Sequence, residues 1–572
     1  MKPPVRFPWY RVPERGGQCG FAVSRKTAKP CVWTGLDRSG TRATTLEAFL
    51  TQAPTASPRY GLWAGLLILA GLACRFWFVA SGQLNLVQDE AQYWDWTRHL
   101  QLTYYSKGPL IAWIIKAGTL VAGNTELGVR LGSILGAAAF QTLLYLAPAR
   151  LWQRPDLGFW AVAVTASSPL FLALGILMTT DNPFVLCWTG ALFCLWAAGE
   201  GKGGRTPYAL LALCLGFGLL AKYTMLGFLG LAAAYGLYLE WKGWRPRGFW
   251  PWLILALGAG LALGFLPTLV WNFQNDFVGY KHVLYLIGVE GKGAEKLLRL
   301  DRFPEYFGSQ VGLATPWWLW LMLAASVAGL LAALRAPARA QGLEAASARR
   351  QALLVLFFLP VWGFFLLWSF HAKVLPNWTT VSYVAGALLA AERFAALVRD
   401  PARAKARNAL LGLSALIFLV LHLSPALPLP PSVDILGRLK GWSDMGRKAD
   451  ELRQGLPDPA RCFFLSDVYD TTAELAFYVP GQPRAFCVWA DDRRMNQYDL
   501  WPGPQDRAGQ DAIFVRKGVQ GPLPPKITDL FAAVSEPIHF QSQHRGRPAR
   551  SFTLYVCTGY KGTWYSDPSG RF

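Results

Sequence analysis

The sequence carries little charge for its length. Only 16% of its 572 residues are charged, whereas 53% are hydrophobic and 26 are Trp. A soluble chain of this size has more charge and fewer long apolar runs. Several runs approach or exceed the roughly 18–20 residues that cross about 30 Å of hydrocarbon. The composition therefore excludes an ordinary soluble protein and indicates a polytopic helical membrane protein.

Cysteine motifs for metal or redox chemistry are also missing. No CxxC and no Cys/His cluster occurs, so no metal site is predicted from these residues. Four of the nine cysteines lie in apolar runs, where we expect small core residues. Cys462, Cys487 and Cys557 lie in the polar C-terminal part, where one pair could form a disulfide if that part is outside the cytoplasm.

The N-terminal segment lacks an apolar core near Met1, so it does not resemble a signal peptide. We expect residues 1–59 to form a basic, poorly ordered cytoplasmic tail. The formal net charge of the chain is +21. Its Lys and Arg residues cluster in short loops between apolar runs, which is the pattern of the positive-inside rule. We therefore expect no nucleic-acid partner.

About eleven membrane spans are predicted. Their approximate cores are 61–80, 126–147, 157–177, 183–199, 208–222, 223–240, 251–271, 311–334, 352–370, 376–396 and 409–425. The shorter run 108–122 is expected to be an interfacial or re-entrant helix. Basic loops follow the second, fourth, sixth, eighth and tenth spans. If these loops face the cytoplasm, the N-terminus does too, and the chain after about residue 425 lies outside.

That C-terminal part is no longer membrane-like. RCFFLSD, RAFCVWA, DAIFVRK and RSFTLYVCTGY are typical of short strands, and TTAELAFYV is typical of a helix. The chain therefore divides into the tail 1–59, a transmembrane domain 60–425 and a small extracytoplasmic α/β domain 426–572. No internal repeat is evident.

Polar residues gather where the predicted spans reach the outer side. The stretches are QDEAQYW after the first span, MTTDNP after the third, Lys222–Tyr223 after the fifth, WNFQNDFVGYKH in the long outer loop 272–310, and HAKVLPNW after the ninth. A carboxylate there could take a proton from an attacking hydroxyl or amine. Lysines could neutralise a phosphate leaving group, and aromatics line sugar and isoprenoid surfaces. A sugar donor carried on a lipid phosphate needs all three.

Structural interpretations stay open for these residues. Asp89 and Glu90 could only mark a solvated helix N-terminus. Asp181 could be a helix N-cap, and Lys107 could only extend its ammonium to the membrane interface. Two other functions also remain, a transporter or lipid flippase and a membrane scaffold. A transporter tends to place ionisable residues near the bilayer midplane and to contain repeats.

The motifs resemble those of the polyprenyl-phosphate-dependent GT-C glycosyltransferases. Within these, the chain looks closest to the dolichyl-phosphate-mannose-protein mannosyltransferase-like group, which includes aminoarabinose transferases acting on lipid A. The matching features are Asp89–Glu90 with Tyr93 in DEAQYW, Lys107 and Pro109 in YYSKGPLIAW, Arg130 in GVRLGS, Asp181 in TTDNP and Lys373 in KVLPNW. Members that act on lipid A differ at Gln92 and Ser106, where they carry Arg and Glu.

The resemblance implies an all-α GT-C fold with juxtamembrane helices in the first outer loop and a catalytic domain over 60–425. It implies inverting transfer from a polyprenyl-phosphate sugar, with Asp89 as general base and Lys107 on the phosphate. The candidate residues are, for catalysis, Asp89, Glu90 and Asp181; for the donor phosphate, Lys107, Lys373, Arg75 and Lys222; and for substrate contact, Tyr93, Tyr105, His371 and Asn377.

The expected partners are a polyprenyl-phosphate sugar donor, membrane lipids and a protein, lipid or glycan acceptor. No cofactor is expected to be required, although a divalent metal is possible, and no metal ligand is assigned. The expected location is a bacterial-type inner membrane.

Overall fold

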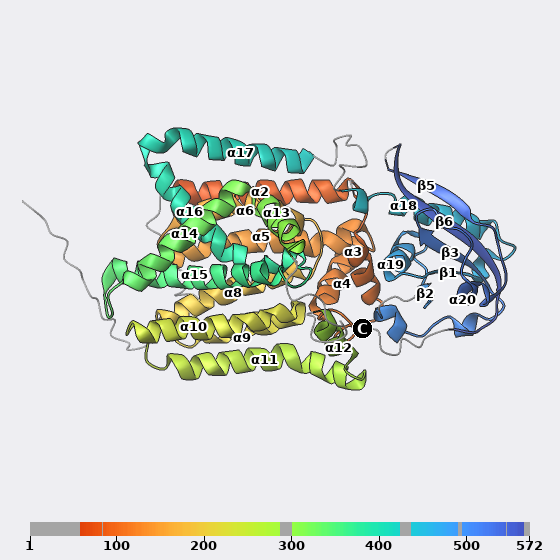
Figure 1. The fold of residues 1–572 in the computed structure, drawn as a ribbon, viewed down its shortest axis with the longest axis horizontal. Helices are drawn as coiled ribbons and strands as arrows, with labels where there is room; N and C mark the ends of the chain where they lie inside the picture. The colour runs from red at the N-terminus through yellow and green to blue at the C-terminus, as the bar shows by residue number, and fades with distance from the viewer. Residues whose placement is uncertain are drawn as a thin grey trace, which may run out of the picture. The chain divides into compact units, whose positions relative to one another are not determined.

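A computed structural model describes residues 58–82, 84–286, 300–423, 436–489, 495–544 and 546–564. Most of the predicted tail 1–59 lies outside these residues. Long helices lying side by side make up the first part of the described chain, and a sheet follows them (Figure 1). The helices up to residue 423 are α2 (Pro58–Ala80), α3 (Gln88–Trp96), α4 (Leu110–Ala122), α5 (Glu126–Leu151), α6 (Pro155–Ala166), α7 (Pro169–Leu174), α8 (Asp181–Gly199), α9 (Thr206–Ala221), α10 (Gly227–Trp241), α11 (Phe249–Gln274), α12 (Val278–Leu286), α13 (Arg302–Ala314), α14 (Pro316–Arg335), α15 (Gly342–Trp368), α16 (Ser382–Arg399) and α17 (Ala404–Leu423).

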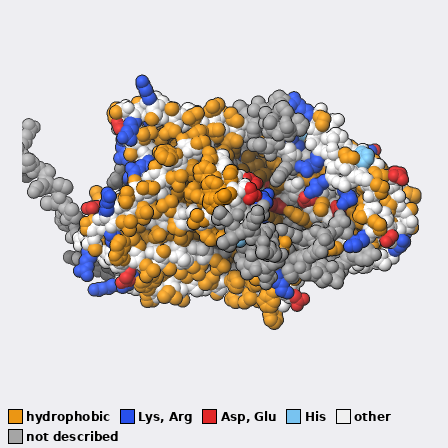
Figure 2. All heavy atoms as spheres, in the orientation of Figure 1, with side chains coloured by type: hydrophobic (Ala, Val, Ile, Leu, Met, Phe, Trp, Pro, Cys, Tyr) orange, Lys and Arg blue, Asp and Glu red, His pale blue; other side chains and the backbone are white. Residues whose placement is uncertain are grey.

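Seven helices in the described part of the chain are long and apolar enough to cross a membrane. They are α2, α5, α8, α11, α14, α15 and the segment Pro401–Leu421, which contains most of α17. Each coincides with a predicted span. Hydrophobic side chains cover most of the bundle surface in Figure 2, as lipid contact requires. The prediction of a helical, multi-pass membrane protein is confirmed, whereas the count of eleven spans stays a prediction.

Other predicted spans are shorter or interrupted helices. The run 157–177 divides into α6 and α7 because Pro169 opens a new helix and the preceding Ser168 takes an extended backbone. The run 223–240 begins with the 3-10 turn Tyr223–Leu226 before α10, and 376–396 begins with the turn Pro376–Thr379 before α16. The predicted helices of the first loop are present as α3 and α4.

The basic loops do share one end of the bundle. Arg349 pairs with Glu200 at 2.6 Å, Arg399 lies 3.5 Å from Asp156, and the Lys242 ammonium donates to the Ala336 carbonyl at 2.7 Å. These contacts join the loops after the fourth, sixth and eighth predicted spans, and the loop after the second with that after the tenth. The Arg350 guanidinium lies over the Trp152 ring, 5.6 Å from its centroid, and so joins the two sets. The five basic loops therefore lie at one end of the bundle, and the assignment of that end to the cytoplasm stays a prediction.

The C-terminal part forms a mixed six-stranded sheet. Its elements are α18 (Trp442–Gln454), β1 (Cys462–Ser466), α19 (Tyr469–Tyr478), β2 (Ala485–Cys487), β3 (Asp511–Lys517), α20 (Pro525–Thr528), β4 (Phe531–Val534), β5 (Ile538–His544) and β6 (Arg547–Tyr560). The order is β2-β1-β3-β6-β4, and β5 also pairs with β6. The β1–β2 and β1–β3 pairs are parallel, and the three pairs that β6 makes are antiparallel. The predicted strands and helix are confirmed; β4, β5 and α18 were not predicted.

Strand β1 explains how the sheet is held to the helices. All five of its residues are buried, as in a strand covered on both faces. Phe464 belongs to a core that also contains Trp94 and Trp96 of α3, whereas the neighbouring Phe463 points into a separate core within the sheet region. The sheet and the first-loop helices therefore share one hydrophobic core.

The disulfide that one pair of the C-terminal cysteines could form is not present in the described residues. Cys462, Cys487 and Cys557 are buried, and none of the three is in a disulfide. They lie on β1, β2 and β6, and Cys487 is level with Ser466 of β1 rather than with Cys462. Strand β3 separates β1 from β6. The strand register therefore keeps the three thiols at separate positions of the sheet.

Candidate active site

The acid pair at the start of α3 separates into two environments. Glu90 is fully buried and lies against Arg130 of α5, with 2.7 Å between Glu90 Oε2 and Arg130 Nη2. It also accepts from the backbone N–H of Val87 and of Met178 at 2.9 and 2.7 Å. All its lone pairs therefore point into protein. The geometry makes Glu90, predicted to be catalytic, a residue that fixes the start of α3.

Asp89 instead remains open to solvent. The Tyr469 hydroxyl of α19 donates to Asp89 Oδ1 at 3.5 Å. Solvent reaches the side chain, yet the surrounding protein removes enough water to raise the pKa of the Asp89 carboxyl. The nearby charge of Lys107 opposes this rise, and the charge of Asp470 adds to it. Asp89 thus combines access for a substrate with the environment of a general base.

Lys107 lies in a loop that is pressed onto the end of α9. A Cβ atom added to the next residue, Gly108, would lie 2.0 Å from the Leu220 carbonyl oxygen. Lys222 directly follows that end of α9. Burial lowers the pKa of the Lys107 ammonium, and the neighbouring charge of Lys222 lowers it further. Gly108 therefore lets two lysines from distant parts of the chain approach each other.

Replacing Gly108 by Ala is expected to shift the Lys107 loop and to lower both thermal stability and activity. The obstacle is backbone, which cannot swing aside as a flexible side chain can. We expect a loss of about 1–3 kcal/mol in stability. Thermal unfolding in detergent measures it, with Gly136→Ala in α5 as the control, because an added Cβ there meets no atom within 4 Å. Equal melting of the two variants would contradict this packing.

Asp181 links the start of α8 to two other elements, the end of α9 and the turn Pro376–Thr379. It is buried at the start of α8, where Lys222 Nζ lies 2.7 Å from its Oδ1 and Asn377 Nδ2 donates to its Oδ2 at 2.7 Å. Asn377 lies in the turn Pro376–Thr379, and Gln310 of α13 donates to the Pro376 carbonyl at 3.1 Å. Asp181 therefore orients Lys222, and a buried polar network orients Asn377.

The structure brings together only some of the predicted site residues. Asp89, Lys107, Lys222, Asp181 and Asn377 form one cluster, called the site cluster below, through the contacts and charge interactions already given. Figure 2 shows acidic and basic side chains side by side in a hollow next to the apolar surface.

Two predicted aromatics flank the site cluster. Tyr93 is buried in α3, packed on Trp96 with 4.9 Å between ring centroids. The Tyr105 ring packs on His282 at 4.5 Å, and its backbone N–H donates to Gln497 Oε1 at 2.7 Å. Tyr93 therefore supports α3, which carries Asp89, and Tyr105 supports the loop that carries Lys107.

Three other predicted residues are placed apart from these contacts. His371 packs on Trp368 at 5.2 Å, and Lys373 is exposed. Arg75 is buried within α2, where a Cβ on Gly175 would lie 2.4 Å from its Nε. No contact described by the structure joins Arg75 to the site cluster, so its predicted role on the donor phosphate gains no support.

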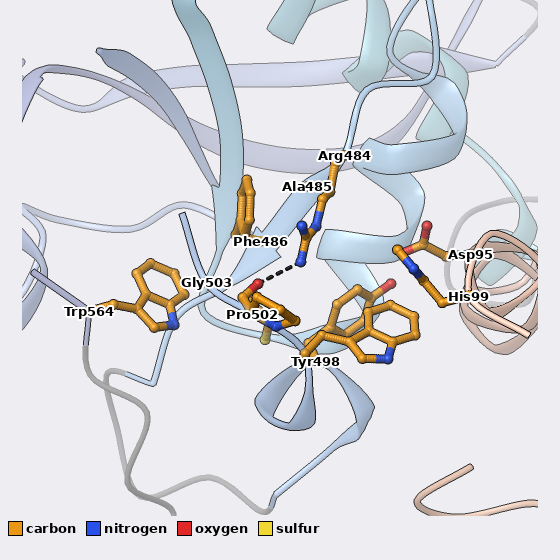
Figure 3. Close-up of a pocket in the computed structure, with 11 residues that line it drawn as sticks. Asp95, His99, Arg484, Ala485, Phe486, Tyr498, Pro502, Gly503 and Trp564 are labelled. Atoms are coloured by element: carbon orange, nitrogen blue, oxygen red, sulfur yellow. Dashed lines mark hydrogen bonds between the residues drawn. The ribbon is translucent and has the colours of Figure 1, made fainter. Parts of the chain in front are cut away.

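A pocket at the seam between α3 and the sheet was not predicted (Figure 3). Its lining includes Asp95, His99, Arg484, Tyr498, Trp501 and Trp564. The His99 and Trp501 rings lie 4.8 Å apart, and burial raises the pKa of the Asp95 carboxyl. The pocket adjoins Gln497, the partner of Tyr105. Contacts of this kind between residues about 390 positions apart leave no periodic signal in the sequence.

No group of three His, Cys, Asp or Glu side chains in the described ranges could hold a metal ion. That finding does not decide whether the reaction uses one, so the expectation that no cofactor is required stays a prediction.

The fold and the site cluster define a class, a multi-pass membrane enzyme with two aspartates and two lysines at one end of a helix bundle. Residues 106–271 match the family model of the dolichyl-phosphate-mannose-protein mannosyltransferases. The match contains Lys107, Asp181 and Lys222. The resemblance predicted from the motifs is confirmed.

Similar proteins agree with this assignment. The lipid A galacturonosyltransferase RgtD of Rhizobium johnstonii is 27% identical over 400 residues, which cover 69% of this chain and 78% of that enzyme. An undecaprenyl phosphate-alpha-4-amino-4-deoxy-L-arabinose arabinosyl transferase of Pseudomonas aeruginosa is 28% identical over 284 residues, 47% of this chain and 46% of the relative. The chain thus matches about half of the arabinosyl transferase. The predicted glycosyltransferase class is confirmed, and the transporter alternative finds no support in these relatives.

Solved structures show the same fold. ArnT from Cupriavidus metallidurans bound to undecaprenyl phosphate superposes with a TM-score of 0.58 at 15% identity, covering 86% of this chain and 98% of that one. Its apo form gives 0.56 at 14% identity, covering 87% and 98%.

Proposed function

We propose that this chain transfers a sugar from a polyprenyl phosphate to an acceptor at the outer face of a bacterial inner membrane. The single observation that carries the proposal is the site cluster, in which an accessible carboxylate, Asp89, lies beside the lysine pair Lys107 and Lys222. The family domain supports the reaction class. Undecaprenyl phosphate, bound in the ArnT structure, supports the class of donor.

The reaction follows from the positions of these groups. Asp89 takes the proton of the acceptor hydroxyl or amine as its oxygen or nitrogen bonds to the anomeric carbon. The bond from that carbon to the phosphate oxygen breaks, and the electron pair leaves with the lipid phosphate. Lys107 and Lys222 stabilise the negative charge that develops there. Attack from the side opposite the phosphate inverts the anomeric centre.

The environment of Lys107 suits this role. Burial and a neighbouring cation lower the pKa of this ammonium, so the protein alone disfavours its charged form. A bound phosphate stabilises that charged form. Asp181 holds Lys222 in place through the 2.7 Å ion pair and keeps the two lysines from separating. The resting site is therefore prepared for a phosphate.

Lipid A is the acceptor that the relatives favour, because RgtD acts on it. A protein or a glycan acceptor is the alternative, and none of the contacts described above supports it. In the proposed orientation the basic end of the bundle faces the cytoplasm and the C-terminal sheet lies in the periplasm. The domain limits 60–425 and 426–572 and the count of about eleven spans belong to the same proposal.

The test begins with purified protein, a panel of undecaprenyl-phosphate sugars and lipid A. Transfer of one sugar, detected by mass spectrometry of the lipid, would establish the donor and the acceptor together. If sugar is released from a donor but not transferred to lipid A, the acceptor is a protein or a glycan. No turnover of any donor would contradict the proposal.

Donor binding supplies a second test. Lys107→Ala should weaken binding of undecaprenyl phosphate by about 10- to 100-fold, because it removes a charge-assisted hydrogen bond from a half-buried site. Lys116→Ala in α4 is the matched control, since it removes a lysine from the same region without touching the site cluster. Equal affinities for the two variants, measured by thermal shift against lipid concentration, would remove Lys107 from the phosphate site.

A further inference from the structure

The C-terminal sheet region reaches the candidate base directly. Tyr469 is the first residue of α19, and its hydroxyl is the hydrogen-bond donor to Asp89. Asp470 is the next residue, and Lys517 of β3 pairs with its carboxylate. The two side chains therefore come from a part of the chain that follows the last predicted span, while Asp89 follows the first.

Helix α19 is held in a fixed register along α3. The Trp94 and Phe477 rings meet edge to face with 4.9 Å between centroids. The Tyr478 hydroxyl accepts from the backbone N–H of Leu86 at 2.7 Å, and Arg98 donates to the Gln482 carbonyl at 3.3 Å. These contacts lie before, within and after α3 and hold the C-terminal end of α19 against it, while Tyr469 opens the other end of α19 beside Asp89.

We propose that Tyr469 and Asp470 are positioning residues of the base: the Tyr469 hydroxyl holds the Asp89 carboxylate, and Asp470, the next residue of α19, adds a negative charge to its surroundings. This inference rests on the proposed function. It gives the C-terminal region a part in the chemistry that an independent lid or a binding module would not have.

The charges around Asp89 determine the direction of each effect. Lys107 from the loop before α4 and the Tyr469 hydroxyl favour the carboxylate, whereas Asp470 on α19 and Glu90 on α3 disfavour it. Tyr93 also lies on α3; burial raises the pKa of its phenol and the charge of Asp89 adds to the rise, so Tyr93 stays neutral. Removing Tyr469 or Asp470 therefore shifts the ionisation of Asp89 in opposite directions.

The test is the pH dependence of kcat/KM for transfer in the full-length protein. Tyr469→Phe removes a donor to the carboxylate, so the pKa of Asp89 rises and the acidic limb moves to higher pH. Asp470→Asn removes a negative charge and frees Lys517, so the pKa falls and the limb moves to lower pH. One pH unit corresponds to about a tenfold change in rate on the limb. Above the limb, both variants should approach the wild-type rate.

Tyr555→Phe is the matched control, because the Tyr555 hydroxyl donates to the Gly521 carbonyl within the sheet region. Its profile should equal that of the wild type. A uniform loss of rate at every pH, or shifts of both variants in the same direction, would overturn the inference. If Tyr469→Phe fails to fold, the Asp470→Asn profile still decides. Loss of the proposed function itself is distinguishable, since wild type and Asp89→Asn would then have equal activity.

Discussion

Asp89→Asn should lower the rate of sugar transfer by about 10²- to 10⁴-fold, which is the range of a lost general base. Asparagine keeps the shape of the side chain and can still accept from Tyr469, so the fold and the donor site should survive. The loss should therefore fall on kcat, with donor affinity close to that of the wild type. The measurement is transfer at saturating donor, together with binding of undecaprenyl phosphate to the same preparation.

A matched variant on the same helix separates chemistry from packing. Asp95→Asn removes a buried carboxyl from α3 that faces the pocket rather than the site cluster. It should retain most of the transfer rate. If Asp89→Asn is as active as Asp95→Asn, Asp89 is not the group that takes the proton of the acceptor. Asp181, held between Lys222 and Asn377, is then the next carboxylate to test.

The sequence predicts the membrane helices well because hydrophobic length is a local property. Every helix that can span the membrane in the described part of the chain falls on a predicted run. The prediction fails in detail where local geometry interrupts an apolar run. Pro169 ends one helix and begins another, so a single predicted span becomes α6 and α7. Hydropathy alone does not register such a break.

The site could be predicted only as far as side-chain chemistry and sidedness allow. Alternation of the basic loops places Asp89, Lys107, Asp181 and Lys222 at one end of the bundle, and the structure brings them together there. Sequence reasoning could not assign different roles to Asp89 and Glu90, because neighbouring residues of a helix differ by about 100° in direction and only packing decides which one is buried. Tyr469 was missed because its partner lies 380 residues away.

The role of Glu90 predicts the largest loss of stability. Arg130→Met leaves the Glu90 carboxylate buried without its cation, which typically costs about 3–5 kcal/mol. Arg130 also donates to the Leu84 and Asn85 carbonyls at 3.0 and 2.7 Å. A lysine cannot reproduce this planar set of donors, so Arg130→Lys should restore little. Thermal unfolding in detergent measures the change.

Two comparisons identify the cause of that loss. Arg154→Met breaks a partly exposed pair with Asp156 and should cost no more than about 1 kcal/mol. Adding Glu90→Gln to Arg130→Met removes the unpaired charge while an amide oxygen can still accept from the Met178 N–H, so the double variant should melt above Arg130→Met alone. Melting of Arg130→Met at the temperature of Arg154→Met would mean that the pair does not hold α3, and the separation of Asp89 from Glu90 would then need another cause. A loss as large as predicted would show that the Glu90–Arg130 pair holds the start of α3. Glu90 is then committed to the fold, and Asp89 is the acid of the pair that remains accessible to a substrate.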